Sequence, residues 1–203
     1  MSDIGEALVG VAIGYLVGTF PSADVVTRLA TRGRVDIRRE GSGNPGGLNS
    51  IRVLGRGWGL LVILLDTAKG ALAGALGLLV GDIACYAAGT AVIAGHVWPV
   101  WTRFRGGRGV ASAGGSFATV FPPFFVIGGV IAGTLALVTR DAGRTIRILC
   151  PVWVAAAVVW WLADLDTAWG PDADPGLVVY SVIGAAIIWS RFRPGVRGAG
   201  GSL

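Results

Sequence analysis

The sequence predicts an all-α membrane protein, a polytopic bundle of about seven transmembrane helices that forms one domain over residues 1–203. Of its 203 residues, 53% are hydrophobic and 14% are charged, and the mean hydropathy is +0.68. A water-soluble domain with a polar surface hardly reaches that balance. The apolar stretches are long and lack the alternation of barrel strands, and only helices or closed barrels satisfy the backbone in lipid. Helices that cross the bilayer repeatedly are therefore expected.

The individual spans are predicted from apolar runs of about 20 residues, the length that crosses a bilayer core. These runs cover residues 4–20, 58–80, 83–101, 148–164 and 177–190. The first run has no basic segment before it and further apolar runs behind it, which favours a retained helix over a cleaved signal peptide.

A further apolar run, residues 109–138, is too long for one ordinary span and contains Phe121-Pro122-Pro123. Because proline removes a backbone donor and breaks a helix, two helices are predicted here. Residues 109–120 would rise only about 18 Å, against a hydrocarbon core of about 30 Å. That helix is expected either to cross the bilayer or to re-enter as a partial helix.

The basic residues support this division, because Lys and Arg in short loops collect on the cytoplasmic side. Arginine clusters follow the first, third, fifth and seventh predicted helices, whereas the intervening loops carry aspartates and no base. An odd number of helices, with the N-terminus outside and the C-terminus cytoplasmic, explains the pattern. We therefore expect a multi-pass protein of the cell inner (plasma) membrane, whose arginines attract anionic membrane lipid and need no nucleic-acid partner.

No metal or cofactor is expected. Cys85 and Cys150 lie in separate apolar stretches without a C-x-x-C pattern or a histidine partner, which is typical of buried, inert thiols. A nucleophile elbow, a zinc-binding motif and an acidic metal cluster on the inner side are all missing from the sequence. Covalent and metal-assisted catalysis are therefore not supported.

The longest inner loop contains a glycine-rich core, Gly41-Ser42-Gly43-Asn44-Pro45-Gly46-Gly47, within Asp36 to Arg52. Residues that permit positive φ can turn successive N–H groups toward one point and bind an anion. Ser42 and Asn44 would add donors, Arg52 would add a counter-charge, and phosphate is the natural ligand. The alternative is a flexible turn that joins two helices.

A second inner loop repeats this pattern, with Arg105-Gly106-Gly107-Arg108-Gly109 leading into an apolar helix. Backbone approach and guanidinium charge at a helix N-terminus suit a phosphate. The alternative is topological anchoring with a glycine hinge.

Ionisable residues within the spans are a third group of candidates. Asp66 and Lys69 are three positions apart and share a helix face, so they form either a structural ion pair or part of a site. His96 lies near the inner end of its helix, where it either ends the helix or serves phosphate binding or proton transfer.

Three segments together resemble the motifs of the bacterial acyl-phosphate:glycerol-3-phosphate acyltransferases, the PlsY-type membrane enzymes. They read G-S-G-N-P-G-G-L-N-S-I-R, L-L-D-T-A-K-G and G-H-V-W-P-V-W-T-R-F-R-G-G-R-G-V-A, and the earlier G-Y-L-V-G-T-F-P-S-A is also similar. The resemblance is strong over residues 10 to about 115. It implies a seven-helix bundle with cytoplasmic motifs, in which acyl phosphate acylates the 1-hydroxyl of glycerol 3-phosphate to give lysophosphatidate and phosphate, without a cofactor.

The resemblance also implies roles for individual residues. The catalytic residues are expected to be Ser42, Asn44, Arg52 and Arg108, and the substrate-binding residues Gly43, Gly46, Gly47, Asn49, Lys69, His96, Arg105, Gly106 and Gly107. Of these, Ser42, Gly43, Asn44 and Asn49 are expected at the acyl phosphate. A monomer is expected, although an oligomer is compatible with the sequence.

The chain departs from the family pattern in places. Gly47-Leu48 stands where the family usually has Ala-Thr, the loop after Thr139-Arg140 is not serine-rich, and residues 192–198 lack the histidine and asparagine of the family's C-terminal pattern. Two alternatives therefore stay open: a different acyl acceptor, or a non-catalytic lipid- or anion-binding membrane protein or organic-anion transporter.

Overall fold

The computed structural model describes residues 1–192, and all of their regular elements are helical. Arg193 and Arg197, which belong to the arginine cluster after the seventh predicted helix, lie outside the described residues. The elements are α1 (Asp3–Gly18), α2 (Ser22–Thr31), α3 (Gly47–Leu54), α4 (Arg56–Leu78), α5 (Asp82–Val97), the 3-10 turn η1 (Val100–Thr102), α6 (Val110–Val120), α7 (Pro122–Thr139), α8 (Ala142–Leu162) and α9 (Pro175–Ser190).

Each apolar run of the sequence is helical in the structure. The predicted break is confirmed, since α6 ends at Val120 and α7 begins at Pro122. Both prolines lie in the first turn of α7, where a residue without an N–H loses no hydrogen bond within the helix. The predicted span 148–164 begins earlier, at Ala142, after Asp141 caps the helix by accepting the Arg144 N–H.

Five helical stretches among the described residues are long and apolar enough to cross a membrane: Asp3–Thr31, Arg56–Leu78, Asp82–Thr102, Pro122–Thr139 and Ala142–Leu162. Two apolar helices are shorter, α6 with 11 residues and α9 with 16. The shortness expected of residues 109–120 is thus present in the structure.

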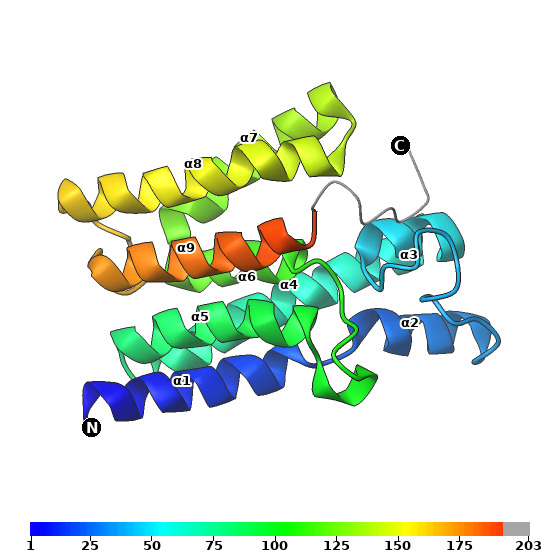
Figure 1. The fold of residues 1–203 in the computed structure, drawn as a ribbon, viewed down its shortest axis with the longest axis horizontal. Helices are drawn as coiled ribbons and strands as arrows, with labels where there is room; N and C mark the ends of the chain where they lie inside the picture. The colour runs from blue at the N-terminus through cyan, green and yellow to red at the C-terminus, as the bar shows by residue number, and fades with distance from the viewer. Residues whose placement is uncertain (193–203) are drawn as a thin grey trace.

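Figure 1 shows α1 and α4 to α9 lying roughly along one axis, with α2, α3 and the η1 loop gathered at the end opposite the N-terminus. The connections from α7 to α8 and from α5 to α6 lie at this same end. All the arginine-rich segments between the described helices are therefore brought to one end of the bundle.

The contact between α1 and α5 aligns the C-terminal ends of these two helices. Gly10, Gly14 and Gly18 form a stripe on α1, and a Cβ on Gly14 would lie 2.2 Å from the backbone oxygen of Ala88. Small residues four apart allow helices in lipid to pack backbone to backbone. As a result, the C-terminal end of α5, with His96, lies next to the junction of α1 and α2.

The larger apolar core lies among α5, α6, α7, α8 and α9. Phe117 stacks edge-on against Phe124 and Trp153, with ring centroids 5.1 and 4.7 Å apart. The hydroxyls of Ser116 and Tyr180 are 2.6 Å apart, so that this buried polar pair is satisfied within the bundle.

Helices α2 and α3 were not predicted as helices, since both lie in what the sequence indicated as one long inner loop. They have 10 and 8 residues, and helices this short are marginal unless one face packs on the rest of the protein. α3 packs on α4: a Cβ on Gly47 would lie 2.1 Å from Cγ1 of Ile63. The isoleucine thus occupies the space that the family's usual alanine would need.

Candidate functional site

The glycine-rich loop is shaped by one buried side chain from α3. Asn49, 2% exposed, accepts the backbone N–H of Ser42 at 2.8 Å and donates to the carbonyls of Ile37 and Glu40 at 3.2 and 3.0 Å. All of these bonds lie within the protein. The predicted substrate-binding residue Asn49 therefore organises the loop in this structure.

The amides that were expected to form an anion nest also bond within the loop. The N–H groups of Gly43 and Gly46 donate to the carbonyls of Glu40 and Asn44, both at 2.9 Å, and the N–H of Asn44 lies 3.5 Å from Ser42 Oγ. Gly43 has a φ of 70°, which makes it a turn residue. The side chains of Ser42 and Asn44, both partly buried, stay candidates for contact with a ligand.

The second loop folds back against the end of α5. The N–H groups of Gly106 and Gly107 donate to the carbonyls of Val97 and His96, both at 3.1 Å. A Cβ on Gly106 would lie 2.0 Å from the His96 carbonyl oxygen, and one on Gly107 would lie 2.2 Å from His96 Nε2 and 3.1 Å from the Pro45 carbonyl. Glycine is therefore required at both positions, and Gly107 lies where the two loops meet.

A buried trio of ionisable side chains lies beneath this junction. Oδ1 of Asp66 is 3.0 Å from Lys69 Nζ and 3.4 Å from His96 Nδ1, and Lys69 also donates to the Phe20 carbonyl at 3.0 Å. The three residues are 2%, 6% and 8% exposed. The sequence paired Asp66 with Lys69, whereas the contact with His96 comes from the packing of α4 on α5.

This trio lines a small pocket with a volume of about 20 Å³. The pocket also has Ser22, Asp24, Arg38, Gly106 and Gly107 in its wall, so α1–α2, α4, α5 and both loops contribute to it. The buried Ser22 hydroxyl has no hydrogen-bond partner among the described residues. The sequence analysis missed Ser22, Asp24 and Arg38 as site residues, because nothing distinguished Arg38 from the other inner arginines.

A cluster of guanidinium groups lies on the side of the site nearer α9. The guanidinium of Arg108 lies 4.7 Å from the centre of the Phe192 ring. Burial lowers the pKa of Arg108, and the charges of Arg191 and Arg52 lower it further, yet arginine stays protonated at physiological pH. Positive charge gathered from α3, the second loop and the end of α9 suits a phosphate. Arg191 is thus a further candidate for the site, which the sequence indicated only as a topological charge.

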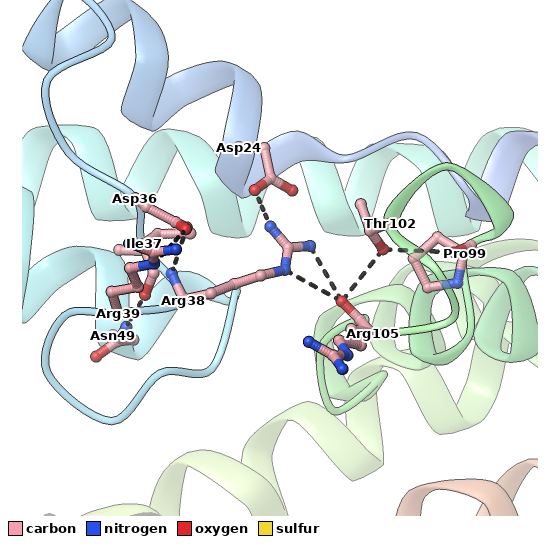
Figure 2. Close-up of polar contacts among 9 residues, drawn as sticks. All are labelled: Asp24, Asp36, Ile37, Arg38, Arg39, Asn49, Pro99, Thr102 and Arg105. Carbon is pink, nitrogen blue, oxygen red and sulfur yellow. Dashed lines mark hydrogen bonds and ion pairs between the residues drawn. The ribbon is translucent and has the colours of Figure 1, made fainter.

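Arg105 is placed differently from Arg108. Its side chain is exposed, while its backbone carbonyl accepts hydrogen bonds from Arg38 and Thr102, as Figure 2 shows. Among the described residues, no group of three or more His, Cys, Asp or Glu side chains could hold a metal ion.

The whole chain is similar to known acyltransferases. Residues 8–198 match the family model described as glycerol-3-phosphate acyltransferase. Glycerol-3-phosphate acyltransferase 4 of Dehalococcoides mccartyi is 37% identical over 197 residues, which cover 94% of this chain and 92% of that protein. The glycerol-3-phosphate acyltransferase of Klebsiella pneumoniae is 40% identical over 166 residues, which cover 79% and 77%.

The fold is similar to a solved structure of the same kind. The crystal structure of PlsY (YgiH), an integral membrane glycerol 3-phosphate acyltransferase, in its glycerol 3-phosphate form, has a TM-score of 0.75 and 28% identity. The match covers 91% of this chain and 87% of that one, and the lysophosphatidic acid form matches with a TM-score of 0.74. The match therefore extends well past residue 115, into the third of the chain where the motifs depart from the pattern. This chain belongs to the glycerol-3-phosphate acyltransferase family.

Proposed function

We propose that this protein transfers an acyl group from acyl phosphate to the 1-hydroxyl of glycerol 3-phosphate, the first acylation of phospholipid synthesis. The observation that carries the proposal is the meeting of two glycine-rich loops at Gly107, beside the guanidinium groups of Arg52, Arg108 and Arg191. Both substrates carry a phosphate, and such a site offers them positive charge from several segments at once.

The chemistry needs no covalent enzyme intermediate, because acyl phosphate is an activated mixed anhydride. The hydroxyl oxygen attacks the acyl carbon, the bond from that carbon to the phosphate oxygen breaks, and the hydroxyl proton passes to an oxygen of the substrate phosphate. The products are lysophosphatidate and inorganic phosphate. Arg52 and Arg108 stabilise the negative charge on the departing phosphate, while Ser42 and Asn44 hold the acyl phosphate in line for attack.

We propose further that α1 and α4 to α9 make seven crossings, with the N-terminus outside and the site on the cytoplasmic side of the inner membrane. The gathering of the arginine-rich segments at one end of the bundle supports this orientation. The whole chain then acts as one membrane domain and, we propose, as a monomer.

The direct test uses purified protein, palmitoyl phosphate and radiolabelled glycerol 3-phosphate. Labelled lysophosphatidate should form together with an equal amount of phosphate. If no labelled product forms and phosphate release matches the protein-free blank, the proposal fails. Anion flux through proteoliposomes in the same preparation would then support a transporter.

An apolar groove of about 470 Å³ between α8 and α9 is our proposed place for the acyl chain. Its wall includes Val154 and Ala155 from α8, and Ala185, Ala186 and Trp189 from α9. Trp189 lies in the last turn of α9, three residues before Phe192, and the Arg108 guanidinium lies over the Phe192 ring. The end of the groove at Trp189 is therefore the end that we propose leads toward Arg108.

Filling this groove should change the preference for acyl-chain length. Ala186→Phe should lower kcat/KM for palmitoyl phosphate about tenfold relative to octanoyl phosphate, because a displaced chain no longer aligns the reacting carbon. Competition between the two donors measures the ratio. Val179→Phe, on the exposed surface of α9 outside the groove, is the matched control. If the ratio of kcat/KM for palmitoyl phosphate to that for octanoyl phosphate is the same in both variants, the groove does not bind the acyl chain.

A further inference from the structure

Arg38 connects the two glycine-rich segments through the backbone of the second one. Its Nε and Nη2 atoms both donate to the carbonyl oxygen of Arg105, at 3.2 and 3.1 Å, and its Nη1 contacts the carboxylate of Asp24 on α2. Figure 2 shows the guanidinium lying between these two partners, with Thr102 donating to the same carbonyl. Three segments far apart in the sequence are thereby joined at one side chain.

The backbone at Arg38 is fixed by contacts of its own. The backbone N–H of Arg38 donates to Asp36 Oδ1 at 3.0 Å, and the preceding Ile37 is 1% exposed within an apolar cluster that includes Val26 and Val62. The carbonyl of Ile37 accepts a hydrogen bond from Asn49, the residue that shapes the first loop. The position of Arg38 therefore depends on the same contacts that shape the Ser42 loop.

The segment that Arg38 holds needs such support. Arg103 and Phe104 have φ values of 54° and 61°, in the left-handed region that side chains other than glycine seldom occupy. Because the peptide unit is planar, two hydrogen bonds to the Arg105 carbonyl fix the plane between Arg105 and Gly106. That plane sets how the segment continues to Gly107 and Arg108.

A planar fork is what this contact requires. Arginine presents Nε and Nη2 in a fixed geometry that grips one acceptor while Nη1 stays free for a second partner. A lysine at this place would keep the positive charge but would offer a single point donor. The charge of Arg38 and its shape can therefore be tested separately.

We infer that Arg38, anchored by Asp24, is a positioning residue that couples the Ser42 loop to the Arg105–Arg108 segment and aligns the two bound substrates. The inference rests on the proposed function. It assigns Arg38 no contact with the reacting atoms, and its effect is on alignment, which lowers kcat, more than on substrate affinity.

The experiment compares Arg38→Lys with Arg38→Gln in the acyl-transfer assay. Both variants should lose kcat by about tenfold or more, while KM for each substrate changes less than about threefold. Asp24→Asn should lose less kcat in the same direction, and the double variant with Arg38→Lys should lose no more than Arg38→Lys alone, because the two residues act as one unit. Arg39→Lys and Arg39→Gln are the matched controls, since Arg39 is the neighbouring arginine with a side chain 86% exposed.

A second measurement does not depend on catalysis. Hydrogen exchange at the amides of Gly106 and Gly107 should quicken in Arg38→Lys and stay unchanged in both Arg39 variants. Wild-type kcat in Arg38→Lys, together with a raised KM in Arg38→Gln, would show that Arg38 only supplies charge and would overturn the inference. The inference would also be overturned if kcat in the Arg38 variants fell only in proportion to the fraction of protein that is folded. If wild-type protein makes no lysophosphatidate, the proposed function fails, whereas the exchange result still decides whether Arg38 holds the segment.

Discussion

Replacing Arg108 by alanine should lower kcat/KM for acyl transfer by about 100-fold, which corresponds to about 2.7 kcal/mol of transition-state stabilisation. The guanidinium is partly buried over the Phe192 ring, and its burial, together with the charges of Arg191 and Arg52, lowers its pKa. In Arg108→Ala, the negative charge that develops on the departing phosphate would no longer be stabilised by this guanidinium. Initial rates at varied palmitoyl phosphate measure the loss.

The controls separate this role from general positive charge. Arg103→Ala removes an exposed arginine from the same loop and should stay within about twofold of wild type, as surface substitutions usually do. Arg108→Lys should fall between wild type and alanine, because lysine keeps the charge but loses the planar fork. A loss smaller than about threefold in Arg108→Ala would place the phosphate elsewhere.

Replacing Asp66 by alanine should destabilise the folded protein by about 3–5 kcal/mol, because Lys69 and His96 would keep their burial and lose their shared acceptor. Unfolding in detergent micelles, followed by tryptophan fluorescence, measures the change. Activity should be lost as well, since the trio lines the pocket beneath both loops.

The matched control for this second prediction is Asp82→Ala. Asp82 is exposed in the first turn of α5, where a carboxylate contributes at most about 1 kcal/mol through the helix dipole. Asp66→Asn should lie between wild type and Asp66→Ala, because an amide oxygen still accepts a hydrogen bond. Equal stability of Asp66→Ala and Asp82→Ala would mean that the trio contributes no more than a surface charge.

Many residues of the candidate site were predictable from the sequence, but Ser22, Asp24 and Arg38 were missed and the partners of the predicted residues were not predictable. Glycines at positions 106 and 107 suggested close backbone approach, and in the structure His96 and Pro45 are among the residues that approach them. Asn49 was expected at the acyl phosphate, yet its amide bonds to the carbonyls of Ile37 and Glu40. Side-chain amides bind backbone and ligands equally well, so residue type alone does not separate these roles.

What the sequence by itself determined is the sum of local properties. Apolar length defines each membrane helix, the proline pair at Pro122 and Pro123 divides two of them, and alternating charge indicates which ends lie together. Each of these depends on residues near one another in the chain, so each is readable before folding.

Only the tertiary structure decided which of those residues meet. The contacts of Arg38 with the Arg105 carbonyl, of Asp66 with His96, and of Arg108 with Phe192 join residues that are 67, 30 and 84 positions apart. Helices α2 and α3 form for the same reason, since helices this short depend on packing against neighbouring segments for their stability. Contacts over such separations follow from the packing of helices such as α1 on α5. The glycine spacing on α1 indicates a face for close packing, but it does not indicate which helix packs there.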